Sequence, residues 1–163
     1  MDFEAPMDAW IVYIGVAFVS STMLVFALGL TGTPAPNANA AANTIDLVGD
    51  RSVSATAEYE HDGDSFWIDR QQIVLRNDGG TSRATIAFGE ITPAYYDERL
   101  ADVTYGSPIT GDNTFDSTGE FLATVEAAQQ HSANNRPDWQ SANGVVRAKK
   151  VIVGGEHVIL VDV

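Results

Sequence analysis

An uncharged stretch near the N-terminus constrains this chain more than any other feature of its sequence. Residues 9–30 contain no charged side chain, and Trp10 and Tyr13 lie near the start of the stretch. At about 1.5 Å of rise per residue, a helix of this length is roughly 33 Å long, slightly more than the ~30 Å hydrocarbon core of a bilayer. Tryptophan and tyrosine prefer the interface between lipid and water. The stretch therefore predicts a transmembrane helix over residues 9–30, with the lipid bilayer as a partner.

The residues around this stretch favour a retained anchor over a cleaved signal. A secretory signal carries basic residues before a shorter apolar run, whereas residues 1–8 form an acidic tail with Asp2, Glu4 and Asp8. A buried core helix is the main alternative, and it is disfavoured because the stretch is apolar on every side. The first basic residue is Arg51, so the positive-inside rule does not fix the orientation. We expect the following domain on the extracytoplasmic side of the cell membrane.

Small residues within the stretch predict where another helix can approach. Gly15, Ser21 and Gly29 have little or no side chain, and small residues let helix backbones come close together in a bilayer. Small residues are also common in transmembrane helices generally, so both interpretations stay open. We take these three residues as the candidate helix-packing positions.

The balance of charge limits the partners of the chain. The formal net charge is −13, from 9 basic and 22 acidic residues, and only two of the basic residues are lysines. Such a chain repels nucleic acid. An acidic, lysine-poor composition also suits high salt, where the Debye length falls to about 3 Å and repulsion between carboxylates is screened. The chain has no cysteine, which excludes disulfides and cysteine-based metal sites.

Beyond the uncharged stretch, the sequence predicts a linker and one small domain. Pro34 and Pro36 end the first helix. Residues 31–50 are rich in Pro, Ala and Asn, and they are predicted to form a linker with a short helix that Asn37 or Asn39 caps. The remainder, residues 51–163, is predicted to be a β-rich domain that is long enough to bury its own core.

Alternating apolar and polar residues predict about seven short strands in this domain. The sequence VSATAEY alternates over residues 53–59, NDGG at residues 77–80 is a strong hairpin signal, and the glycine pair at 154–155 joins two strands near the end. A further strand is expected over residues 101–105. The regular spacing of these strands favours a small antiparallel sandwich.

One helix is expected among the strands. Ser117 and Glu120 form the S-x-x-E pattern of a capping box, and apolar residues follow at helical spacing. The expected fold class is therefore an N-terminal transmembrane α-helix plus a small mainly-β (α+β) domain, which is an antiparallel sandwich with one helix.

The sequence carries no signature of catalysis or of a cofactor. His61, Asp62 and Asp64 cluster at a predicted turn, but a calcium loop would continue with further oxygen ligands. Neither the glycine motifs that bind nucleotides nor the G-x-S-x-G motif of hydrolases occurs. We therefore predict no catalytic, cofactor-binding or metal-binding residue, and no enzyme activity.

The chain has one basic cluster, formed by Arg147, Lys149 and Lys150. Strand alternation predicts that Arg147 and Lys149 share one face and that Lys150 lies on the other. We take the cluster as a candidate patch for an acidic protein partner. Neutralisation of nearby carboxylates is the alternative role.

Four stretches of the sequence resemble a family of uncharacterised haloarchaeal single-pass membrane proteins: MDFEAPMDAW, NANAAANTIDLVGD, IVLRNDGGTSRATIAFGEITP and VIVGGEHVILVDV. The resemblance covers essentially the whole chain. It implies a membrane protein that accompanies type IV pilus-like (Tad-like) systems, and it carries over no catalytic residue.

These observations are compatible with three functions. The one we expect is a membrane-anchored, non-enzymatic envelope or assembly protein, whose helix engages a membrane or envelope protein and whose β domain binds a partner. The second is a minor pilin-like subunit assembled through its N-terminal hydrophobic helix, although the basic residue that prepilin processing needs is missing before the apolar run. The third is a membrane-bound enzyme or small-ligand binder that uses acidic residues.

Overall fold

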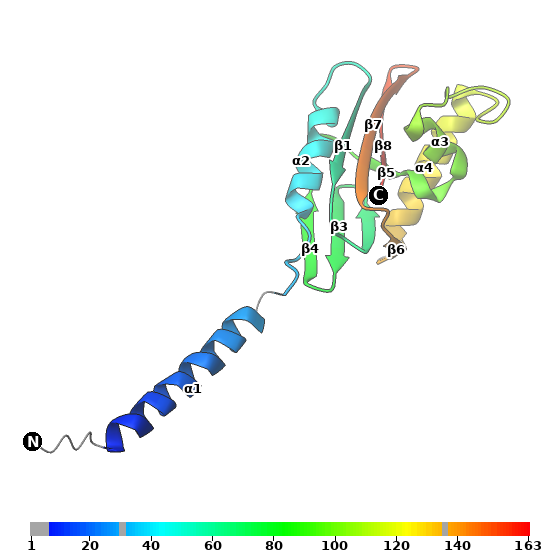
Figure 1. Ribbon diagram of the computed structural model, residues 1–163. Helices are drawn as coiled ribbons and strands as arrows, with labels where there is room; N and C mark the ends of the chain where they lie inside the picture. Colours follow the sequence, from blue (N-terminus) through cyan, green and yellow to red (C-terminus); the bar gives the residue numbers. More distant parts are fainter. Residues whose placement is uncertain (1–6, 30–31, 135–136) are drawn as a thin grey trace, which may run out of the picture. The chain divides into compact units, whose positions relative to one another are not determined.

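The computed structural model describes residues 7–29, 32–134 and 137–163, and the chain divides into two compact units (Figure 1). The first unit, residues 1–33, holds the helix α1 (Met7–Gly29), whose side chains are described from Tyr13 to Leu24. The second unit, residues 34–163, holds every other described helix and strand.

The first unit corrects the prediction of a membrane span. No helix in the part of the chain that the structure describes is both long and apolar enough to cross a membrane, so the predicted transmembrane helix over residues 9–30 is wrong. Within α1, hydroxyl side chains interrupt the apolar ones, and those of Ser21 and Thr22 donate to backbone carbonyls one turn earlier.

The second unit is a small α+β domain. Its described elements are three α-helices, one 3-10 helix and eight strands. In chain order they are α2 (Ala38–Gly49), β1 (Ala55–Glu60), β2 (Ser65–Asp69), β3 (Gln72–Asn77), β4 (Gly80–Thr85), β5 (Ile91–Pro93), η1 (Ala94–Tyr96), α3 (Glu98–Tyr105), α4 (Thr118–Asn134), β6 (Gln140–Ser141), β7 (Val145–Val153) and β8 (Glu156–Asp162).

The strands form two four-stranded sheets with the orders β1-β7-β8-β5 and β4-β3-β2-β6. The hairpin predicted at residues 77–80 is confirmed between β3 and β4, and the one at 154–155 is confirmed between β7 and β8. The parallel pairing of β5 with β8 was not predicted. The expected antiparallel sandwich with one helix is thus corrected to an α+β fold with a parallel pair and three α-helices in this unit.

The strand expected over residues 101–105 is instead part of the helix α3. The carboxylate of Asp97 accepts a backbone N–H of the first turn, and Gly106 ends the helix with a φ of +119°. Leu100 and Val103 are buried on the same side of the helix. Both capping residues lie outside the five residues that predicted a strand, and a run this short does not separate the two periodicities.

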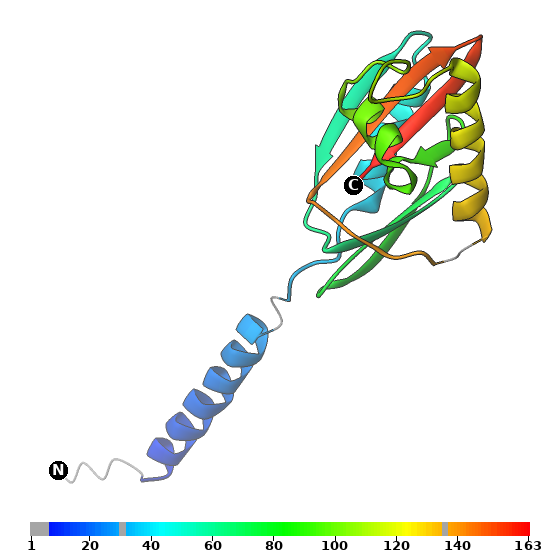
Figure 2. The same ribbon diagram turned by 90° about the vertical axis from the view of Figure 1, so that its right-hand side faces the viewer.

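The sheet β1-β7-β8-β5 is covered on both faces, so the domain has two apolar cores. One core lies between this sheet, the second sheet and α2, and the other lies beneath α3 and α4, which Figure 2 shows against the same sheet. Strand β7 supplies both: Val146 and Ala148 belong to the first core, and Val151 and Val153 belong to the second. Each fully buried valine contributes roughly 1.5–3 kcal/mol.

Helix α2 packs against both sheets, with contacts to β1, β4 and β7. Asn37 caps it, because the Asn37 side chain accepts the N–H of Ala40 at 3.1 Å. The buried side of α2 begins with alanines and continues with Ile45 and Val48. The helix therefore completes the first core through small side chains at its start and large ones near its end.

The end of α3 generates a stability prediction. A Cβ on Gly106 would meet no atom within 4 Å, so the cost of Gly106→Ala is conformational, about 1–2 kcal/mol for an L-residue at positive φ. Gly119→Ala, in the first turn of α4, is the matched control because its φ is ordinary and its Cβ would lie 3.8 Å from the nearest atom. Urea unfolding should show G106A destabilised and G119A unchanged or stabilised. Equal stabilities of the two variants would contradict this account.

Candidate functional site

The structure divides the basic cluster that the sequence singled out. Arg147 and Lys149 lie on the side of β7 that α3 covers, and Lys150 lies on the side that α2 covers. The predicted alternation along the strand is therefore present. The three side chains do not form one surface, because the sheet itself separates Lys150 from the other two.

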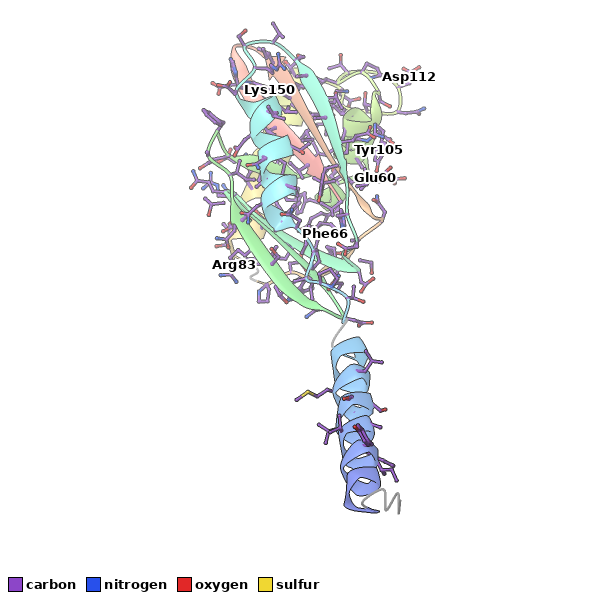
Figure 3. All side chains as sticks on the ribbon, turned by 60° about the vertical axis from the view of Figure 1, so that its left-hand side comes forward. Glu60, Phe66, Arg83, Tyr105, Asp112 and Lys150 are labelled. Carbon is purple, nitrogen blue, oxygen red and sulfur yellow. The ribbon has the colours of Figure 1, made fainter. Side chains whose placement is uncertain are left out.

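Lys150 holds the end of α2 in place. Its side chain is only 5 % exposed, and its Nζ donates to the carbonyl of Gly49 at 2.7 Å and to that of Arg51. These are carbonyls at a helix C-terminus, where the helix dipole favours a positive charge. Figure 3 shows Lys150 beside that end of α2.

Lys149 and Arg147 have structural partners on the opposite face. The Lys149 Nζ donates to the carbonyl of Val103 near the end of α3, and burial, followed by the charge of Arg147, lowers the pKa of Lys149. Arg147 forms an ion pair with Glu58 at 2.7 Å and lies over the ring of Tyr105, 4.5 Å from its centroid. Each of the three basic side chains thus connects β7 to a neighbouring element.

The helix-packing positions lie on α1, which belongs to the other unit. A Cβ on Gly15 would meet no atom within 4 Å, so a neighbouring helix has room there. The Ser21 hydroxyl donates to the Ala17 carbonyl at 2.7 Å and stays exposed. Gly29 is the last residue of α1, and its surroundings lie outside the described residues.

The acidic turn at residues 61–64 is held by backbone contacts. The N–H of Gly63 donates to Nδ1 of His61 at 3.0 Å, and the N–H of His61 donates to the carbonyl of Gly144 at 2.8 Å. Burial lowers the pKa of His61, and the nearby Asp62 opposes that shift. The described residues contain no group of three or more His, Cys, Asp or Glu side chains that could hold a metal ion.

Carboxylates also gather in a surface depression of about 420 Å³ between α4 and β8, which the sequence did not reveal. Glu90, Glu126, Glu156 and His157 line it. Glu90 already forms an ion pair with Arg70 at 2.8 Å. The depression is therefore an acidic part of the domain surface.

An ion-pair network between α3 and α4 was also missed by sequence reasoning. Arg99 pairs with Asp97 at 3.0 Å and with Glu120 at 2.6 Å, and its guanidinium lies 4.4 Å from the centroid of the Phe115 ring. Hydrogen bonding to Arg99 lowers the pKa values of both carboxyl groups. The capping box was the only sequence signal at this place, and it revealed only Glu120.

An apolar groove between α2 and β1 is the surface feature most suited to binding. It has a volume of about 370 Å³ and is lined by Leu47 and Val48 of α2, by Arg51 and Val53 of the connecting segment, and by Ala55, Thr56 and Ala57 of β1. Leu47 is 62 % exposed and Val53 is 63 % exposed. Leu47 is apolar but lies between the buried positions Ile45 and Val48, on another side of α2. This position was the signal in the sequence for an exposed apolar surface.

The α2–β1 groove brings apolar side chains to the surface of the domain. A family model matches residues 4–151 of the chain. The chain belongs to the family of unknown function DUF7283. No curated protein and no solved structure matches this DUF7283 protein.

The buried lysine of this DUF7283 protein can be tested by substitution. Lys150→Met keeps the apolar length of the side chain but leaves the carbonyls of Gly49 and Arg51 without their donor, which should cost about 2 kcal/mol. Lys149→Met is the matched control: its side chain is only half-buried and caps one carbonyl, so we expect a smaller loss. Urea unfolding at pH 7 measures both. A K150M variant as stable as the parent would exclude the capping role.

The lowered pKa of His61 makes stability depend on pH. A histidine with a folded pKa below its unfolded value stabilises the protein above about pH 6.5, and this contribution is lost as pH falls through the folded pKa. His61→Asn keeps an acceptor for the Gly63 N–H but does not titrate. Between pH 7.5 and 5, the free energy of unfolding should therefore fall more steeply for the parent than for H61N. Parallel pH profiles of the two proteins would refute the assignment.

Proposed function

We propose that this protein is a non-enzymatic assembly subunit. Its helix α1 is covered by apolar helices of other subunits, and its α+β domain binds a protein partner. The observation that carries the proposal is the exposure of large apolar side chains along α1. These are Tyr13, Ile14, Val16, Phe18, Val19, Met23 and Leu24.

Apolar helices are the occupants that suit α1. Contiguous apolar surface of this size marks an interaction site in a folded protein, and each buried side chain of this kind gains roughly 1.5–3 kcal/mol. At about 100° per residue, the exposed apolar side chains between residues 13 and 24 lie on all sides of the helix, so they do not form one stripe. Several helices around α1 cover such a surface, whereas a single groove covers only one side.

The setting we propose is a pilus-like assembly in the envelope of a haloarchaeon. The acidic, lysine-poor composition supports an origin in high salt, where screening removes most of the repulsion between carboxylates. The resemblance of the chain to proteins that accompany such systems supports the assembly. A membrane-associated, extracytoplasmic location stays a prediction.

The perturbed side chains of the domain support a structural role. Lys149 caps α3, and His61 orders a turn. Burial, together with the charge of Asp138, raises the pKa of Tyr95 to about 12, and the Tyr95 ring packs edge-on against Phe66 in the core. Perturbed groups that serve catalysis usually converge in a cleft, whereas these serve separate elements.

A photo-cross-linking experiment on α1 tests the proposal. A photoreactive phenylalanine analogue replaces the exposed Phe18 in the full-length protein, in cells at molar KCl. We expect adducts with apolar helices of other proteins or other copies. Gly15→Leu should reduce adduct formation at least tenfold, because the added side chain fills the space that a neighbouring backbone needs.

Gly15→Ala is the matched control, because it raises helix propensity but adds only one carbon. Adduct formation by G15A at the parent level, with loss in G15L, supports close helix packing. Adducts with lipid alone, or equal yields from G15L and G15A, would contradict the proposal.

A further inference from the structure

We propose that the outer edge of β1 and the apolar groove beside it bind an extended segment of a partner protein by strand addition. The segment has apolar residues on its groove side and basic residues on its other side. The inference rests on the proposed role in binding proteins, and it names the site on the domain and the chemistry of the partner.

The backbone of β1 has a hydrogen-bonding edge to offer. β1 is the first strand in the order β1-β7-β8-β5, so its only ladder partner in the described residues is β7. The N–H of His61 donates to the carbonyl of Gly144 on the β7 side. Because antiparallel strands alternate the direction of their backbone groups, Thr56, Glu58 and Glu60 point theirs away from β7. An added strand would pair with these groups.

The groove supplies the apolar side of the site. Ala55, Ala57 and Tyr59 face the first core but stay half-buried, and the two alanines line the groove together with Leu47 and Val53. The short alanine side chains leave space beneath α2. Valine or isoleucine side chains at alternate positions of an added strand would fill this space, because such a strand continues the pleat of β1.

The other face of β1 supplies the charge preference. Glu60 lies there exposed, as Figure 3 shows, and Glu58 keeps half of its side chain exposed while it pairs with Arg147. Basic residues in the partner strand would lie opposite these carboxylates. A second copy of β1 would instead bring glutamates face to face, which is destabilising. A different, basic segment is therefore the better occupant.

The edge of β4 offers a natural comparison. The N–H of Ile86 donates to the carbonyl of Gln71, so the same alternation leaves the backbone groups of Thr81, Arg83 and Thr85 directed outward. The core-facing Ala84 of this strand is buried, unlike the half-buried alanines of β1. The β4 edge thus presents backbone hydrogen-bonding groups beside the positive charge of Arg83, and among the described residues it has no apolar groove like that of β1.

The test uses the full-length protein in mild detergent and two eight-residue peptides, one alternating Val and Lys and the other alternating Val and Glu. The Val-Lys peptide should slow amide exchange at residues 56, 58 and 60 and bind at least tenfold more tightly than the Val-Glu peptide in 0.1 M KCl. Thr56→Pro removes an outward N–H, which an edge strand tolerates, and should weaken binding at least tenfold. Thr85→Pro makes the same change on β4 and should leave binding unchanged.

Leu47→Ser gives a second variant that spares the fold, because Leu47 is exposed, and it should weaken binding severalfold. Protection on β4 instead of β1, equal effects of T56P and T85P, or equal binding of the two peptides would overturn the proposal. The α1 cross-links are independent of this site. Loss of peptide binding with those cross-links intact would therefore refute strand addition alone, and loss of the cross-links alone would refute the role of α1.

Discussion

The structure of the domain depends on β7, the strand that has a core on each side. Val146 and Ala148 pack on one side and Val151 and Val153 on the other, so a shift of one residue in its register would exchange the two sets. Lys149 and Lys150 follow the same alternation, and each donates to carbonyls at the end of a different helix. The register of one strand thereby fixes the sheet, both cores and the ends of α2 and α3.

This arrangement also explains how so acidic a chain uses its few cations. Both of its lysines are directed to helix carbonyls, and three described arginines, Arg70, Arg99 and Arg147, join separate elements through carboxylates. A buried or half-buried ammonium with carbonyl partners is screened less by salt than an exposed pair. The two lysines therefore stabilise the fold at ionic strengths where surface pairs contribute little.

Sequence reasoning succeeded for tight turns and a helix cap, and it failed for the short run at residues 101–105 and for features that form only in the fold. The hairpin at 77–80 and the capping box, in which the N–H of Glu120 donates to Ser117 at 3.2 Å, follow from a few adjacent residues. The parallel pairing of β5 with β8 joins residues far apart in the chain, and nothing in either segment predicts it. The α2–β1 groove was missed although its walls lie close together in the chain, because they face each other only in the fold. The uncharged stretch predicted a helix correctly, but the prediction that this helix spans a membrane is wrong.

The two surfaces argued to bind partners differ in how they respond to salt. Association of the apolar helix α1 needs no charge, and salts that strengthen apolar burial favour it. The β1 edge combines backbone hydrogen bonds and the groove with the carboxylates of Glu58 and Glu60. At molar salt the attraction between these carboxylates and a basic partner is largely screened. Under that condition the backbone hydrogen bonds and the groove supply the affinity of the edge. In dilute salt, apolar burial in the groove is weaker, but repulsion between the same carboxylates is stronger. This repulsion protects the edge from pairing with a second β1 strand.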